Sequence, residues 1–210
     1  MTFGSVYEIT NPLSTVAKQH FVDWFTGKDL DTKRWNKYDV QGTGTFAMED
    51  NANSGFKVKA GNGNNEESEL DFNNIRPYSQ TGSIIIMVTK AVNSGNGYWT
   101  NNWGFTNTQG LGNDYACIQN QDSDPYFSLI SKDTSFNRTN SSMLIDLGWH
   151  NHKLECTSSN LIYTLDGLLE VSKTANRPTA VLQPVFNIQT QSADDDGGEG
   201  LIRYCEAWNT

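Results

Sequence analysis

The chain has 210 residues, a length at which a β-sandwich or barrel still forms one domain and buries a core without a metal or a disulfide framework. It is rich in Gly, Asn, Ser, Thr and aromatic residues, which favour strands and polar turns over helices. The formal net charge of -9 argues against a nucleic-acid partner, because clustered Lys and Arg are absent, and it disfavours polyanionic substrates such as alginate.

Residues 1–17 are predicted to form an extended arm or edge strand, with Pro12 at a turn. The arm carries several large apolar residues that have no obvious place in a closed sandwich, so we expect it to contact subunits of another protein or a second copy of the chain. This N-terminus has neither a basic leader nor an uninterrupted apolar stretch, and we therefore expect no signal peptide. No run of 18 apolar residues occurs, so no membrane insertion is expected.

Residues 18–210 are predicted to be one domain of short strands separated by Gly, Asn, Asp and Pro turns, a cadence typical of a sandwich or barrel. The segment TGSIIIMVTKA is β-branched and mostly apolar, which predicts a central strand buried on both faces. The segment LIYTLDGLLEVSK predicts a hairpin, because Asp166 and Gly167 tolerate the positive backbone angles of a tight two-residue turn.

Three cysteines, Cys117, Cys156 and Cys205, each lie in an apolar, strand-like run rather than in a CxxC pair. Buried free thiols are the expected state, because free Cys behaves as a small hydrophobe. A bridge between Cys156 and Cys205 is the alternative.

Several segments, in order, resemble the concanavalin A-like lectin and glucanase superfamily. DWFTGKDLDTKRW resembles the FxxxxLDxxxW opening of many members, and WHNHKLECTSSNLIYTLDGLLEV resembles their WHxxxI and xxYxxDGxxV hairpin. RPTAVLQPVFNIQT and LIRYCEAWNT resemble the closing strands. The resemblance covers nearly all of the chain after residue 20, and it implies an all-β fold, a two-sheet antiparallel jelly-roll sandwich.

A second resemblance rests on EAWNT and NIRPYSQTGS, which look like segments of orphan proteins of tailed phages that infect marine bacteria. It implies a virion component exposed on a capsid, fibre or tail. The expected location is then the virion surface.

The enzymes of this superfamily resemble family 16 glycoside hydrolases, whose ExDxxE or ExDxE strand points its carboxylates into one cleft. The nearest candidate here is Glu67, Glu69 and Asp71, which share a strand face, but Asn73 or Asn74 stands where the second catalytic Glu is expected. The segment PYSQTGSIIIMVTKA resembles a middle strand of the family. The family's catalytic motif follows that strand, whereas Glu67, Glu69 and Asp71 precede it. The arginine-containing strand and partner strands of an alginate lyase are missing as well, so we expect no catalytic residue and no enzyme.

Two groups of residues are candidate metal ligands. The first group could offer oxygens to a calcium ion and consists of Asp194, Asp195, Asp196 and Glu199; the second is Asp122 with Asp124. The alternative for each group is a solvated loop that binds no ion. His150 and His152 lack a third zinc ligand and are expected on a solvated rim. No cofactor is expected to be required.

Sugar rings stack on Trp and Tyr, while amides bond their hydroxyl groups. The candidate glycan-binding residues are Tyr98, Trp99, Asn101, Asn102 and Trp103, and strand alternation puts Trp99 and Trp103 on one face. The alternative is that both indoles are core residues.

Together these patterns predict a non-enzymatic, lectin-like module on a virion surface, with a structural, decoration or adhesion role and a neutral or cell-surface glycan as a second partner. The alternatives are a soluble carbohydrate-binding module and a family 16-like glycoside hydrolase or polysaccharide lyase.

Overall fold

The computed structural model describes residues 20–25, 29–40, 42–49, 54–72, 78–92, 99–121, 124–191 and 198–210. The described residues form β-strands joined by turns, and none of them belongs to a helix that could cross a membrane. The predicted arm, residues 1–17, lies outside the described residues. The strands are β1 (His20–Trp24), β2 (Asn36–Asp39), β3 (Thr45–Glu49), β4 (Gly55–Lys59), β5 (Glu66–Asp71), β6 (Ser83–Val92), β7 (Trp99–Thr106), β8 (Tyr115–Gln121), β9 (Asp124–Lys132), β10 (Phe136–Leu144), β11 (Trp149–Cys156), β12 (Leu161–Leu165), β13 (Leu168–Lys173), β14 (Gln183–Thr190) and β15 (Glu199–Asn209).

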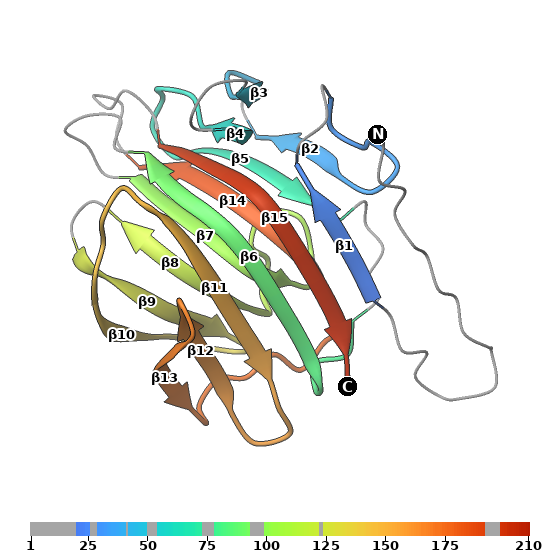
Figure 1. Ribbon diagram of the computed structural model, residues 1–210, viewed down its shortest axis with the longest axis vertical. Coiled ribbons are helices and arrows are strands. Elements are labelled where there is room, and N and C mark those ends of the chain that lie inside the picture. Colours follow the sequence, from blue (N-terminus) through green and yellow to red (C-terminus); the bar gives the residue numbers. More distant parts are fainter. Residues whose placement is uncertain are drawn as a thin grey trace.

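These strands form two antiparallel sheets that pack face to face, which confirms the predicted jelly-roll sandwich (Figure 1). The eight-stranded sheet runs β13-β12-β11-β6-β15-β4-β3, with β1 also paired to β15. The seven-stranded sheet runs β10-β9-β8-β7-β14-β5-β2. Neighbouring strands are often far apart in the sequence, as when β14 inserts between β7 and β5.

The core lies between the sheets, and alternation along each strand decides which side chains enter it. In β6, Ile85 and Met87 are buried, whereas Ile84 and Ile86 face outward and stay partly exposed. The prediction that β6 is central is confirmed, since β11 and β15 flank it. The prediction that both of its faces are buried is wrong, because no described segment covers the outer face of the eight-stranded sheet.

The predicted hairpin is confirmed as β12 and β13. Leu165 pairs with Leu168, which leaves Asp166 and Gly167 as the two-residue turn, with φ of 48° and 85°. Positive φ at both central positions is what a turn matching the twist of the two strands requires.

Strand β7 lies between β8 and β14 and is buried along its whole length. Gly104 has a φ of 152°, and a Cβ there would collide with the carbonyl of Ala116 and lie 2.9 Å from Cα of Cys117. A residue with a side chain would therefore push β7 and β8 apart.

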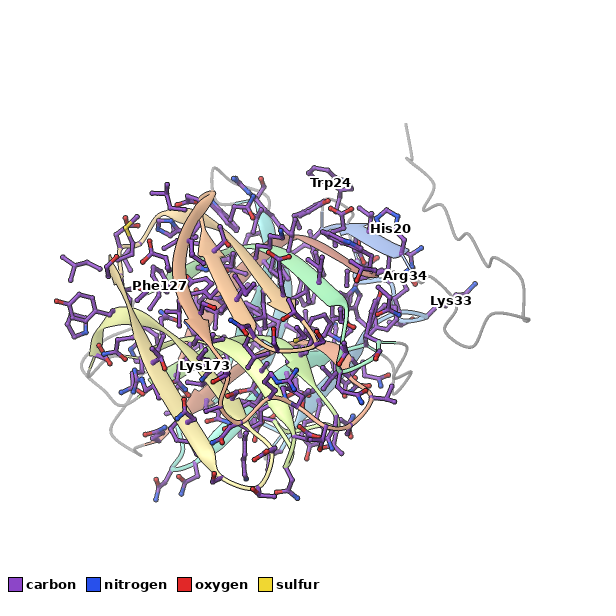
Figure 2. The ribbon with its side chains drawn as sticks, turned by 90° about the horizontal axis from the view of Figure 1, so that it is seen from below. His20, Trp24, Lys33, Arg34, Phe127 and Lys173 are labelled. Carbon is purple, nitrogen blue, oxygen red and sulfur yellow. The ribbon has the colours of Figure 1, made fainter. Side chains whose placement is uncertain are left out.

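Lys173 ties the two sheets together. Its Nζ donates to the carbonyls of Leu129 and Asn137 at 3.0 and 3.2 Å and to the Asn137 amide oxygen at 3.1 Å. Figure 2 shows Lys173 and Phe127 within the body of the protein and Trp24 at its outer surface. Burial lowers the pKa of Lys173 to about 8, because removal from water disfavours the charged amine.

Candidate functional site

An open cleft of about 380 Å³ lies on the outer face of the seven-stranded sheet, the face turned away from the core. We call this face of β5, β14, β7, β8, β9 and β10 the cleft face. The cleft combines amides, hydroxyls, aromatic rings and cations, supplied by Thr100, Asn102, Gly110, Leu111, Tyr115, Gln119, Gln121, Ile130, Lys132, Phe136, Arg138, Gln189 and Gln191.

A row of hydrogen-bonded amides crosses the cleft face. Gln119 Nε2 donates to Asn102 Oδ1 at 2.8 Å, and Asn102 Nδ2 donates to Asn187 Oδ1 at 3.1 Å. Asn187 Nδ2 then donates to Glu69 Oε2 at 2.8 Å. These residues stand opposite one another on β8, β7, β14 and β5, so the register of the sheet creates the row. We call Gln119, Asn102, Asn187 and Glu69 the amide row.

Three carboxyl groups, those of Glu67, Glu69 and Asp71, lie at the β5 end of this face, and their alternation on one strand face is as predicted. Asn187 Nδ2 also donates to Glu67 Oε1, so both glutamates accept from one nitrogen. Burial raises the pKa of Glu69 to about 8, and the neighbouring Glu67 and Asp71 add to the rise. Burial also raises the pKa of Glu67 and of Asp71. Glu69 therefore carries a proton at neutral pH.

The loop between β7 and β8 covers the Glu69 carboxyl group. Gly110 N donates to Glu69 Oε1 at 3.2 Å, and Glu69 has no exposed surface. The far end of the loop is fixed by Asp114, whose carboxylate accepts from Thr179 N at 2.9 Å and from Ala180 N at 2.6 Å. The loop thus separates the β5 carboxyl groups from the open part of the cleft.

The opposite end of the cleft is aromatic and cationic. Lys132 on β9 stands directly between Tyr115 on β8 and Phe136 on β10, so the three side chains share the cleft face. Arg138 lies two positions further along β10, with Nη2 2.8 Å from Asp124 Oδ2 and Nε donating to Ser128 Oγ at 3.0 Å.

The predicted glycan-binding segment straddles both faces of β7. Trp99 and Trp103 do share a face, but it is the inner one, where Trp103 packs on Phe186 with ring centroids 6.1 Å apart. Asn101 points inward as well, and only Asn102 lines the cleft. The placement of the two indoles in a glycan site is therefore corrected to the core alternative, which removes more apolar surface from water. Tyr98 lies outside the described residues.

The candidate metal ligands do not assemble into a site among the described residues, where no cluster of His, Cys, Asp or Glu could hold an ion. Glu199 instead lies 3.7 Å from Lys57 Nζ, and Asp124 is paired with Arg138. Asp194, Asp195, Asp196 and Asp122 lie outside the described residues, so calcium binding there stays a prediction.

The two histidines are buried, and their predicted position on a solvated rim is wrong. His150 is held between Asp166 Oδ2 at 2.7 Å and Asp146 Oδ1 at 2.9 Å. Burial lowers the pKa of His150, but the hydrogen bonds to these carboxylates outweigh that effect and the net shift is upward. His152 lies against Trp103, where burial keeps its pKa well below the usual value.

The structure also tests the predicted state of the three cysteines. Cys117, Cys156 and Cys205 are free and buried, as expected, and the alternative bridge is absent.

Sequence reasoning missed most of the cleft, namely Gln119 and Gln121 on β8, Asn187 and Gln189 on β14, Lys132 on β9 and Arg138 on β10. One signal was present. Amide residues stand two positions apart, at Gln119 and Gln121 in YACIQNQ and at Asn187 and Gln189 in VFNIQT, within strands that begin with apolar residues. Such residues must bond one another or a ligand.

Comparisons with known proteins place the chain by its fold. No family model matches the sequence, and no curated protein matches it either. Among solved structures, the GlcNAcα1-4Gal-releasing endo-β-galactosidase from Clostridium perfringens is 15% identical, with a TM-score of 0.69 over 95% of this chain and 64% of the other. A family 16 endo-glucanase from Bacteroides ovatus is 13% identical, with a TM-score of 0.62 over 89% of this chain and 99% of the other. A pseudo β-1,3-glucanase of Mycobacterium tuberculosis is 17% identical, with a TM-score of 0.60 over 90% and 98%.

The chain therefore shares its two-sheet jelly-roll fold with these proteins. The phage resemblance gains no support from these neighbours. The virion role, the virion location and the subunit partners stay predictions.

The expectation that the chain is not an enzyme is overturned by the same neighbours, because an endo-β-galactosidase and an endo-glucanase share its fold. That expectation rested on a missing glutamate, on the position of the segment before TGSIIIMVTKA, and on the missing strands of an alginate lyase. The structure shows why such a gap excludes little: the cleft face draws its polar groups from six strands, and Glu67 and Glu69 already meet at Asn187.

Proposed function

We propose that this protein binds a carbohydrate chain in the cleft of the seven-stranded sheet. The observation that carries the proposal is the amide row, because two of its members, Asn102 and Gln119, line the open cleft with amide groups held in a fixed orientation. Amides of this kind bond sugar hydroxyls in either direction, since each has a carbonyl oxygen and an NH₂ group. Tyr115 and Phe136 at the cleft end supply apolar faces on which a sugar ring stacks.

Binding is tested by titrating soluble hexasaccharides of glucose, galactose and mannose, and their acidic counterparts, into the protein by calorimetry. Gln119→Ala should weaken binding of the preferred oligosaccharide by about fivefold or more, the worth of one or two hydrogen bonds. Asn151→Ala is the matched control, because Asn151 lies on β11 in the other sheet and is exposed. Equal affinity of the Gln119 variant and wild type would place any binding elsewhere.

A second candidate function is hydrolysis of the bound glycan, and the Glu67 and Glu69 pair favours it. Two carboxyl oxygens that accept from one amide nitrogen lie within roughly 6 Å of each other, close to the spacing of about 5 Å in retaining glycosidases. Glu69, protonated at neutral pH, would give its proton to the glycosidic oxygen while Glu67 attacks the anomeric carbon and the C–O bond breaks. Water would then release the sugar from Glu67, with the Glu69 carboxylate taking the proton.

This reaction requires a movement of the loop between β7 and β8. Glu69 is fully buried and accepts the Gly110 N–H, so a glycan reaches it only when that hydrogen bond opens. Opening the loop costs the free energy of one hydrogen bond to a buried group. Contacts between the glycan and the amide row can offset this cost.

Hydrolysis is tested by measuring the release of reducing ends from the oligosaccharide that binds best. Glu69→Gln should lower the rate by about a hundredfold or more, the usual contribution of a general acid. Glu155→Gln, on β11 of the other sheet, is the matched control and should leave the rate unchanged. A wild-type protein that binds the oligosaccharide but releases no reducing ends would reject hydrolysis and leave glycan binding in place.

A further inference from the structure

Charge is distributed unevenly across the cleft face. The carboxyl groups gather on β5, at Glu67, Glu69 and Asp71, behind the loop that carries Gly110. The described residues that line the open cleft include two cationic side chains, Lys132 and Arg138, and no carboxylate. Among the described residues, the lining of the cleft is therefore cationic, although the net charge of the chain is -9.

The two cations differ in how far they are neutralised. Arg138 is neutralised by Asp124, 2.8 Å away. Lys132 Nζ contacts the Asn113 amide oxygen at 3.4 Å, and among the described residues no carboxylate lies within ion-pair distance of it. An ammonium group that lines a cleft without a counter-ion gains a charge-assisted hydrogen bond from an anionic ligand group.

The neighbours of Lys132 fix where that anionic group would sit. Tyr115 and Phe136 flank it in the same cross-strand row, and Phe136 is 54% exposed. A sugar ring stacked on either aromatic side chain would hold its exocyclic substituents beside the ammonium group. Gln119, a member of the amide row, lies on the same strand as Tyr115 and would hydrogen-bond the next sugar of the glycan.

We infer that the cleft accepts a glycan that carries an anionic substituent, a uronic acid carboxylate or a sulfate ester, and that Lys132 is the specificity-determining residue that binds this group. The inference rests on the proposed function and names its substrate class. It replaces the expectation of a neutral glycan, which was drawn from the net charge. Net charge acts over distances that salt screens beyond about 8 to 10 Å, whereas the Lys132 ammonium would act in direct contact.

The test compares oligosaccharides that differ in charge but little else. One pair is β-1,4-linked mannohexaose and hexamannuronate; the other is a κ-carrageenan hexasaccharide and its desulfated form. In roughly 150 mM salt, wild type should bind one charged member about tenfold more tightly than its neutral match, which corresponds to one charge-assisted hydrogen bond. Preference within the first pair identifies a carboxylate, and preference within the second a sulfate.

Lys132→Gln should remove this preference, so that the variant binds the charged and the neutral member of the pair with affinities within about twofold of each other. Lys153→Gln is the matched control, because it makes the same charge change on β11, in the other sheet. Thermal unfolding of each variant checks that it is folded.

Each remaining outcome overturns the inference. If wild type binds both members of each pair equally, glycan binding stands and the anionic preference is rejected. An equal loss in Lys132→Gln and Lys153→Gln would reduce the preference to general surface attraction. If no oligosaccharide binds wild type, the proposed function fails and the inference fails with it.

Discussion

Glu69 occupies a position in which a carboxyl group is more stable with its proton than without it. It has no exposed surface, and Asn187 and Gly110 provide only two hydrogen bonds to a group that would otherwise be a buried anion. Burial is the largest cause of its raised pKa, and the nearby carboxyl groups of Glu67 and Asp71 act in the same direction. The folded protein therefore binds a proton that the unfolded chain releases at neutral pH.

The stability of the protein should consequently fall as pH rises. A group whose pKa is about 8 when folded and 4.5 in its ordinary state contributes fully below the lower value, and its contribution is lost as pH rises through the higher one. The contribution of Glu69 to the free energy of unfolding should decrease by roughly 4 kcal/mol between pH 5 and pH 9, and Lys173, whose pKa is lowered on folding, acts in the opposite direction. Urea titrations at a series of pH values measure this change.

Glu69→Gln is the variant that isolates this effect, because the amide stays neutral throughout and keeps a similar shape. Its unfolding free energy should vary far less over the same pH range, and above pH 8 the variant should be more stable than wild type. The same slope in both proteins would assign the pH dependence to other groups, with Glu67 and Asp71 first among them.

At the scale of a single strand, β7 shows that alternation predicts which side chains share a face but does not predict which face meets the core. The two-residue period correctly puts Trp99 and Trp103 on one face, but both faces of WTNNWGFT are buried, so the pattern does not mark which face meets the core. A shift by one residue exchanges every side chain between the faces. In the structure the face with the larger side chains meets the core, and Trp103 and Phe105 fill the space between the sheets.

Strand β5 shows the reverse case. Alternation predicted from SELDF that Glu67, Glu69 and Asp71 share a face, and the sheet register confirms it. Their protonation and their contact with Asn187 were not predictable, because the partner strand β14 lies more than 100 residues further along the chain. The amide row needs four strands in one register, and no local pattern carries that register.

For the molecule as a whole, the cadence of short strands predicted a sandwich or barrel, and the resemblance to the concanavalin A-like superfamily implied the two-sheet sandwich that the structure has. The cleft was not predictable at this scale either, since its walls come from strands whose order in the sheet is set by long-range pairing. Net charge, a property of the whole chain, gave no indication of the local cationic surface at Lys132.

The three buried thiols offer a test of whether both sheets belong to one cooperative unit. Cys117 lies in the seven-stranded sheet, whereas Cys156 and Cys205 lie in the eight-stranded sheet. Burial raises the pKa of all three thiols, to about 12 for Cys156, so the reactive thiolate is scarce in the folded protein. Because one core joins the sheets, all three should become reactive toward a thiol reagent at the same urea concentration, and in the absence of urea each should react at least roughly a thousandfold more slowly than in the unfolded chain. Mass spectrometry of the labelled protein counts the modified cysteines at each concentration. Labelling of Cys117 in one transition and of Cys156 and Cys205 in another would contradict a single domain and show that the sheets unfold separately.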